Sequence, residues 1–442
     1  MSKTFRDWDC EQTLMFPPSV LDFVPEGHLA HFVRETAQDS LDLSAILSVY
    51  SEERGYPPYH PVMMTALLLY AYTQGIYSSR RISKACQERV DFMAVTAMQR
   101  PDFRTVSDFR KRHLEALRGL FVQVLRLCQQ AGLVKLGHVA LDGTKVKANA
   151  SKHKAMSYGR MKKAEPELAA VVRGWLDKAQ TADAREDQEF GADRSGEELP
   201  DWVSDKQRRL EKLREAKAAL EAEAAQAAAP EQETEGQAGA PKRGRPPKDP
   251  PGVPKENAQR NFTDPDSRIM KSGDGFVQAF NAQAAVDADS QVIVAQTLSN
   301  HASDAQELAP VVAQIKQNTG RQARELSADA GYCSEENLQE LNRRHISGYV
   351  ATGRIQHGQA SVPGGRKLRA GSRAQAMRRK LQRAGRRSRY RLRKQVVEPV
   401  FGQIKQGRGF RQFLLRGLEK VTGEWSLVCT AHNLLKLAAA RA

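Results

Sequence analysis

The sequence lacks the features of a secreted or membrane-spanning protein. No apolar run approaches the ~20 residues that a membrane helix needs, and the N-terminus is polar and charged, unlike a secretory signal. The few cysteines show neither paired spacing nor the spacing of metal ligands, which fits a reducing compartment. They are Cys10, Cys86, Cys128, Cys333 and Cys429. We therefore expect a cytoplasmic protein with no membrane partner.

Acidic residues are absent from one long stretch near the C-terminus. Between Arg366 and Lys394 there are 14 lysines and arginines and no acid, whereas the whole chain has 68 basic and 52 acidic residues and a net charge of +16. Such a concentrated basic segment is typical of a protein that binds a polyanion, most often nucleic acid. A solvated basic tail is the alternative. We expect the segment to line a DNA path and to be poorly ordered without DNA.

Residues 1–132 are predicted to form a helical domain for DNA binding or oligomerisation. The run PVMMTALLLYAYTQG predicts a helix that begins at Pro61 and ends at Gly75. Residues 107–132 also have apolar residues at helical spacing. A short basic helix with Arg80 and Arg81 lies between them. These elements fit either a helix-turn-helix or a plain helical packing domain.

Residues 153–271 are predicted to be an insertion. Apolar spacing between about residues 160 and 226 indicates an antiparallel helical hairpin, and the following residues have the composition of a disordered linker. The linker contains PKRGRPPK, in which Arg243-Gly244-Arg245-Pro246 resembles the core of an AT-hook. Arg243 and Arg245 would then enter the minor groove of A·T-rich DNA. Alternatively, they are spacer residues that add only general attraction to DNA.

The remaining segments, 133–152 and 272–442, are predicted to form one α/β domain, a mixed sheet flanked by helices. GFVQAFNAQAAVD and SQVIVAQTLS indicate a hairpin with its turn at Asp287 to Ser290. Short strands then alternate with helices. His301 and Asp304 are expected to cap the beginning of the first of these helices.

Three carboxylates of this domain form a candidate site. Asp142 lies within the strand-like run VALDGTKVK, and Asp329 lies at the carboxyl end of a short strand, where α/β sheets gather ligands. Glu398 precedes Pro399, and because proline favours the first position of a helix, we expect Glu398 at a helix entrance. Singly, each acid also fits a strand end, a turn or a helix cap. Together they suit two Mg²⁺ ions in a phosphoryl-transfer site.

Several basic residues accompany these acids. Lys145 and Lys147 follow Asp142 directly and are expected to contact the DNA backbone. Lys394 and Lys405 flank Glu398 at a spacing that places all three on roughly one face if the stretch is helical.

Five blocks of the sequence resemble the DDE transposases of bacterial insertion sequences, in the branch with an InsH-like N-terminal domain. They are YPPYHPVMMTALLLYAYTQGIYSSRRI, VALDGTKVKANASK, NFTDPDSRIMKSGDGFVQAFNAQAAVD, ELSADAGYCSEENL and VEPVFGQIKQGRGFRQFLLRGLEKVTGEW. The resemblance implies a ribonuclease H-like catalytic fold, in which Asp142, Asp329 and Glu398 are the catalytic and metal-binding triad. It also implies two Mg²⁺ ions, with Mn²⁺ as a substitute.

The family's Y-x2-R-x3-E-x6-K signature is only partly kept. Glu398 and Lys405 hold the E-x6-K spacing, whereas Lys394 stands at the arginine position and Arg391 at the tyrosine position. Both residues are basic and are expected to bind phosphate. Tyr390 is one residue out of register and receives no role.

The resemblance implies a nucleoid-associated transposase that binds the terminal inverted repeats of its element and cleaves the DNA. It then joins the freed 3′ ends to target DNA, acting as a homodimer or a larger oligomer. Two alternatives remain. One is a ribonuclease H-like nuclease or resolvase that cuts without joining, and the other is a DNA-binding protein without catalytic activity.

Overall fold

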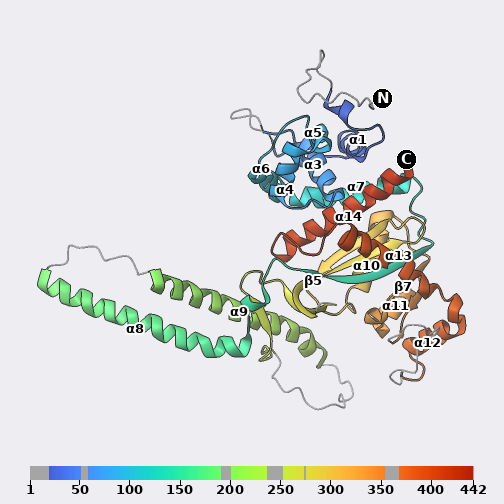
Figure 1. Ribbon diagram of the computed structural model, residues 1–442. Coiled ribbons are helices and arrows are strands. Elements are labelled where there is room, and N and C mark those ends of the chain that lie inside the picture. The colour runs from blue at the N-terminus through green and yellow to red at the C-terminus, as the bar shows by residue number, and fades with distance from the viewer. Residues whose placement is uncertain are drawn as a thin grey trace, which may run out of the picture.

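The computed structural model describes residues 19–50, 58–190, 201–235, 252–272, 275–353 and 368–441 (Figure 1). The AT-hook-like segment, with Arg243 and Arg245, lies outside these residues. Within the described ranges, no helix combines the length and the apolar character that a membrane crossing requires.

The N-terminal region is helical, as predicted. The helix that contains Pro61 begins at that residue, and Gly75 follows it with a φ of 72°. The apolar stretch after residue 102 forms two helices rather than one, since the backbone leaves helical geometry at His113 (φ −106°, ψ 21°). The α-helices of this region are α1 (Leu29–Glu35), α2 (Ser44–Leu47), α3 (Pro61–Thr73), α4 (Ser79–Glu88), α5 (Val90–Val95), α6 (Phe103–Arg112) and α7 (Leu114–Gln130).

The central sheet is mixed, with the strand order β4-β5-β1-β7-β8 and β6 also paired to β5. The three longest strands are antiparallel neighbours, and β7 and β8 run parallel to β1. The predicted hairpin is confirmed as β5 and β6. This topology is consistent with the expected ribonuclease H-like fold. The strands of the sheet are β1 (His138–Lys147), β4 (Arg268–Ser272), β5 (Gly275–Asp287), β6 (Ile293–Ser299), β7 (Glu325–Ala328) and β8 (Ser347–Val350), and a separate pair is formed by β2 (Ala155–Ser157) and β3 (Gln259–Asn261).

Helices surround the sheet and connect its parallel strands (Figure 1). The β6–β7 and β7–β8 connections are helical, as the crossovers of parallel strands usually are. The helices of this region are α10 (Leu308–Thr319), α11 (Glu335–Arg343), α12 (Arg373–Ala384), α13 (Leu392–Gly402) and α14 (Leu418–Arg441).

The C-terminal helix α14 joins the N-terminal helices to the sheet. It packs on α7 and α3 and also on β6. The Trp425 indole donates to the Gln283 carbonyl oxygen of β5 at 3.2 Å, and the Ser426 hydroxyl donates to the Arg118 carbonyl oxygen of α7 at 3.0 Å. One apolar core therefore runs from the N-terminal helices into the sheet.

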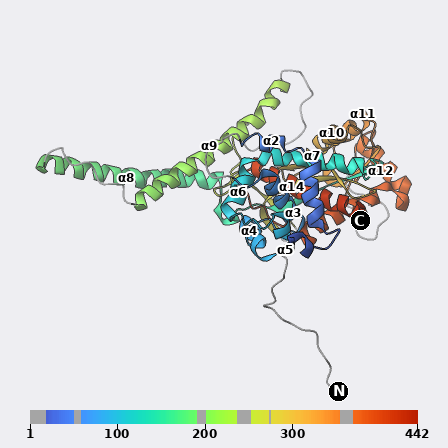
Figure 2. The same ribbon diagram turned by 90° about the horizontal axis from the view of Figure 1, so that it is seen from above.

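The insertion forms the predicted helical hairpin, α8 (Tyr158–Phe190) and α9 (Asp201–Glu235). Both views show the two helices projecting away from the remainder of the molecule (Figures 1 and 2). Glu223 of α9 accepts hydrogen bonds from Arg268 of β4 at 2.9 and 3.1 Å, which fixes the base of the hairpin to the edge of the sheet.

The basic segment is folded over its described part, residues 368–394, contrary to the expectation of poor order. Helix α12 has an apolar face, with Leu381 buried and Met377 packed against the core, and it contacts α11 and β8. The ammonium of Lys380 donates to Ser347 Oγ at 2.9 Å and to the Gly348 carbonyl oxygen at 2.8 Å. An amphipathic pattern inside the basic run thus gives this helix a fixed place.

Candidate active site

Asp142 and Asp329 lie side by side on neighbouring strands. The parallel register pairs Ala140 of β1 with Ser327 of β7, and each aspartate follows two residues later. The backbone is still extended at Asp329 (φ −77°, ψ −177°), so both side chains leave the sheet at the same level and on the same face. The Asp329 carboxylate also accepts from the Gly331 amide at 2.8 Å, which begins the turn after β7.

A bridging arginine links Glu398 to Asp142. Arg393 Nη1 lies 2.5 Å from Asp142 Oδ2, and its Nη2 lies 3.1 Å from Glu398 Oε1. Helix α13 packs on β1, β5 and β7, which brings Glu398 to the two strands that carry the aspartates. The structure therefore gathers the three predicted acids at one end of the sheet.

Glu398 does not stand at a helix entrance, contrary to the prediction. Helix α13 begins at Leu392, so Glu398 and Pro399 lie inside it. A proline within a helix leaves the carbonyl four residues earlier without its usual partner. Here that carbonyl, Gln395 O, accepts from Gln291 Nε2 at 3.1 Å. This tertiary contact explains why the helix passes through Pro399.

Asp142 is the acid of the site whose pKa is raised by burial. Burial raises the pKa of Asp142 to about 7, with Arg393 opposing the shift and the charges of Asp329 and Glu398 adding to it. The Asp142 side chain is 15% exposed, whereas that of Glu398 is 46% exposed. Positive charge is therefore what this site needs to keep all three carboxylates ionised at neutral pH.

Arg393 was missed by the sequence reasoning. The sequence does contain a pattern that could have pointed to Arg393. Tyr390 and Arg393 keep the family's Y-x2-R spacing, but four residues rather than three separate Arg393 from Glu398. Burial raises the pKa of the Tyr390 phenol while Arg393 opposes that shift, so these two side chains adjoin. Lys394, which the sequence favoured, is an exposed residue of α13.

The lysines near the triad have defined partners. Lys405 Nζ donates to the Lys145 carbonyl oxygen at 2.9 Å, which ties the segment after α13 to β1. The Lys145 ammonium lies 3.1 Å from Asp304 Oδ1, and its side chain is 17% exposed. Lys147, two residues further along β1, is exposed.

The other predicted DNA contacts within the described residues are exposed. Arg80 and Arg81 are exposed on α4, and the Arg80 guanidinium lies 5.3 Å from the ring centre of Phe103. Arg391 is exposed immediately before α13.

Asp304 does not act as a helix cap, contrary to expectation. Helix α10 begins at Leu308, and the Asp304 carboxylate instead accepts from β1 and β5 side chains. The neighbouring His301 is exposed, and its Nδ1 atom lies within hydrogen-bonding distance, 3.2 Å, of Glu307 Oε1.

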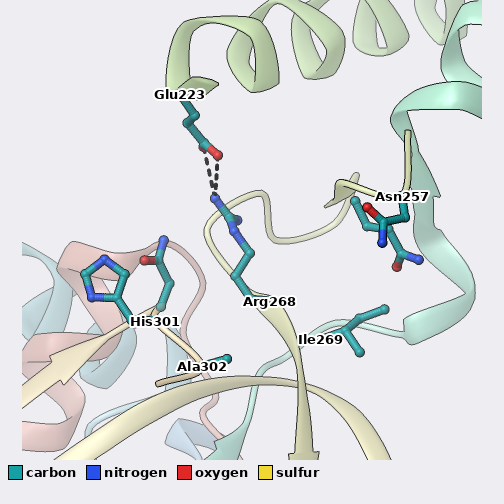
Figure 3. A pocket seen from close by; sticks show the side chains of 8 residues that line it. Glu223, Asn257, Arg268, Ile269, His301 and Ala302 are labelled. Atoms are coloured by element: carbon teal, nitrogen blue, oxygen red, sulfur yellow. Dashed lines mark hydrogen bonds and ion pairs between the residues drawn. The ribbon is translucent and has the colours of Figure 1, made fainter. Parts of the chain in front are cut away.

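A polar cavity of about 690 Å³ lies beside the same loop (Figure 3). Its lining includes Glu223 of α9, Arg268 of β4 and His301. None of the triad residues lines it, so it is separate from the carboxylate site.

The donor set of the triad fits divalent cations of the hard, oxygen-preferring kind. Its members are carboxylates, one of them buried with a raised pKa, and the bridging guanidinium of Arg393 supplies compensating charge. In the described ranges, no three His, Cys, Asp or Glu side chains are close enough together to hold a metal ion.

Carboxylates gathered on neighbouring strands of a mixed sheet and on a helix that packs against them are typical of metal-dependent phosphoryl-transfer enzymes. Two family models then identify the family. A transposase domain model, DUF772, matches residues 18–112, and a transposase DDE domain model matches residues 249–434. The chain belongs to the DDE transposases, enzymes that generally use divalent metal ions. Searches of curated proteins and of solved structures gave no match.

The matched DDE segment contains Asp329 and Glu398 but not Asp142. Asp142 lies between the two matched segments and joins the others through the pairing of β1 with β7. The long insertion after β1 separates it from them in sequence.

Proposed function

We propose that the protein binds the ends of an insertion element, cleaves the DNA there and joins the freed 3′ ends to target DNA. The observation that carries this proposal is the convergence of Asp142, Asp329 and Glu398 from β1, β7 and α13. Three carboxylates on separate elements form the donor set that such chemistry requires.

Asp142, Asp329 and Glu398 would hold two Mg²⁺ ions, with Mn²⁺ as a substitute. When bound, these ions supply positive charge for the attacking and leaving oxygens of the phosphodiester. Asp142 is held rigidly by β1, and Asp329 by its turn, so both side chains are fixed before DNA arrives. Arg393 offsets part of the negative charge of Asp142 and Glu398 in the free protein and is placed to contact a DNA phosphate when released.

We further propose that DNA runs along the exposed basic residues next to the triad. Arg391 and Lys394 lie on the segment that leads to Glu398. Lys147 is exposed on β1 but, like Lys145, belongs to the face of the sheet opposite to Asp142, so it would contact DNA away from the triad. Lys145, being paired with Asp304, contributes to this path chiefly by holding its strand in place.

The N-terminal region, residues 1–132, is proposed to bind the element ends. Phe103 is an exposed aromatic residue, with Arg80 at 5.3 Å and Arg104 at 5.6 Å from its ring centre. An aromatic ring flanked by guanidinium groups is a surface on which nucleic-acid bases stack. Arg81 adjoins this group on α4.

The remaining proposals concern the insertion and the assembly. Residues 133–152 and 272–442 would act as the catalytic domain, and residues 153–271 as an arm whose linker places Arg243 and Arg245 in an A·T-rich minor groove. A homodimer or larger assembly would hold two element ends together.

The test is a cleavage and joining assay with the purified protein. Oligonucleotides that carry the inverted repeats flanking its gene are incubated with a target plasmid and Mg²⁺. We expect nicking at the repeat ends, followed by covalent joining of the 3′ ends to the plasmid. Cleavage without joining would favour the nuclease or resolvase alternative. Binding without cleavage in Mg²⁺ or Mn²⁺ would favour an inactive DNA-binding protein.

A further inference from the structure

Asp304 lies at the centre of a polar network behind the active site. Its Oδ1 atom accepts from Asn281 Nδ2 at 2.7 Å, from Gln283 Nε2 at 3.0 Å and from Lys145 Nζ at 3.1 Å. The Asp304 side chain is 21% exposed. A carboxylate oxygen with three donors, one of them cationic, is strongly held.

The donors to Asp304 come from the face of the sheet opposite to Asp142. Successive residues of a strand point to opposite faces, so Gly143 and Lys145 share one face and Asp142 belongs to the other. The register of β1 with β5 pairs Gly143 with Gln283 and Lys145 with Asn281. Asp304 therefore contacts β1 on the face of the sheet opposite to the Asp142 side chain.

Asp304 also lies against the glycines that adjoin the two aspartates of the triad. A Cβ atom on Gly143 would come within 2.9 Å of Asp304 Oδ1. A Cβ atom on Gly331 would lie 3.2 Å from Asp304 Oδ2 and 3.0 Å from Asp329 Oδ1. Asp304, together with Gln283 at Gly143 and with Asp329 at Gly331, thus fills the space that a larger residue would need at these two positions.

The same network extends to two further parts of the site. The Tyr332 hydroxyl, in the turn after Asp329, donates to Gln283 Oε1. Lys145, which pairs with Asp304, presents its carbonyl oxygen to Lys405. Contacts from Asp304 therefore reach β1, β5, the Asp329 turn and the segment that follows Glu398.

We propose that Asp304 is a positioning residue that sets the separation of Asp142 and Asp329 for divalent-cation binding. This inference rests on the proposed function of the triad. Asp304 acts from the reverse face: it fixes Gly143 and the Gly331 turn and neutralises the Lys145 ammonium. Residues that orient the ligands of a metal typically change metal affinity by 10–100-fold when they are replaced.

The test measures Mn²⁺ binding by the full-length protein without DNA, using the electron paramagnetic resonance signal of free Mn²⁺. Asp304→Asn keeps the shape and one acceptor oxygen but loses the charge. We expect its half-saturation concentration for Mn²⁺ to rise about 10-fold, with DNA affinity unchanged. Cleavage should fall at limiting Mg²⁺ and recover in part at high Mg²⁺. Asp304→Asn combined with Lys145→Met should bind Mn²⁺ more tightly than Asp304→Asn alone, because the unpaired ammonium is gone.

Asp287→Asn is the matched control. Asp287 is a buried aspartate of the same sheet, on β5, and it accepts from the Leu136 amide away from the triad. Its replacement should lower the melting temperature without changing the Mn²⁺ half-saturation.

Two results would overturn the inference. One is that the Asp304→Asn protein binds Mn²⁺ and cleaves DNA as the unsubstituted protein does. The other is that the Asp304→Asn protein, like the Asp287→Asn control, differs from the unsubstituted protein only in a lower melting temperature. Failure of the proposed function is a separate result, in which Asp142→Asn retains both Mn²⁺ binding and cleavage.

Discussion

At the scale of single residues, the active site is a balance between three carboxylates and one guanidinium. Burial is the main cause of the raised pKa of Asp142, and the negative charges of Asp329 and Glu398 add to it. Arg393 contacts two of the three acids and is itself largely buried, with its side chain 13% exposed. In the metal-free protein, the positive charge in the site is thus carried by the Arg393 side chain.

Replacing Arg393 with Gln should slow cleavage more than it weakens DNA binding. In the proposed function the guanidinium contacts a DNA phosphate near the triad, where a positioned charge is worth roughly 10²-fold in rate, whereas affinity depends on many phosphate contacts. Single-turnover cleavage and a binding titration measure the two effects. Lys394→Gln, at the neighbouring exposed residue, is the control and should alter the rate little. Equal effects of the two substitutions would remove Arg393 from the site.

Replacing Asp142 with Asn should change how the stability of the metal-free protein depends on pH. The folded pKa of Asp142, about 7, lies above the ordinary value of 3.8, so the folded state binds the proton more tightly. The Asp142 contribution to stability is therefore full below about pH 4 and is lost as the pH rises to about 7, by an amount on the order of a few kcal/mol. Urea unfolding at pH 5 and pH 8 should show a smaller loss for Asp142→Asn than for the unsubstituted protein. Parallel losses in the two proteins would contradict the burial of this charge.

At the scale of elements, helix α13 depends on a residue far from it in sequence. Gln291, in the β5–β6 turn, supplies the hydrogen bond that Pro399 cannot make. The Gln291 backbone has a φ of 58°, and its carbonyl oxygen is hydrogen-bonded to His432 Nε2 at 2.9 Å, so the turn is itself held by α14. The position of Glu398 is thus set by the hairpin and by the C-terminal helix together.

Gln291→Ala should destabilise the protein by about 1 kcal/mol, the usual worth of such a hydrogen bond. The same substitution should cost less in the background of Pro399→Ala, because the backbone amide that alanine restores at this position can then satisfy Gln395 O. A double-mutant cycle by urea unfolding measures this coupling. Additive effects of the two substitutions would show that the contact does not support α13.

Helix α12 and the turn that follows it present exposed arginines on the basic segment. Replacing Arg379, Arg383 and Arg387 with Gln should weaken binding to all DNA sequences alike and lower the salt slope by about 0.9 per lost phosphate contact. Lys380 is left in place because it anchors the helix. Arg208→Gln with Arg209→Gln, on exposed residues of α9, is the control and should leave the slope unchanged. An unaltered slope after the three substitutions would identify this part of the basic segment as a solvated surface.

At the scale of the whole molecule, the N-terminal helices and the sheet share one core through α14. Much of this arrangement could be predicted from the sequence, because its signals are local: Pro61 and Gly75 bound a helix, and alternating apolar residues mark the β5–β6 hairpin. The sequence also predicted that β1 and the segment after the long insertion form one domain, because Asp142, Asp329 and Glu398 were expected to meet in one site.

Other features could not be predicted because they depend on tertiary contacts. Pro399 marks a helix start in most sequences, and the Gln291 side chain is what allows it inside α13. Arg393 bridges the acids because α13 packs on β1, and this packing cannot be read from the spacing of residues in the sequence. Asp304 resembled a helix cap because its donors, on β1 and β5, are distant in sequence.

The central claim is that Asp142, Asp329 and Glu398 act as one site. Its most direct test is strand cleavage and joining in Mg²⁺ by Asp142→Asn, Asp329→Asn and Glu398→Gln, each measured beside its DNA affinity. We predict that each substitution reduces both reactions by at least about 10³-fold, because the residues of one catalytic unit fail together, while DNA affinity stays close to that of the unsubstituted protein. Substantial cleavage by any one of the three, with the protein folded and bound to DNA, would contradict the claim.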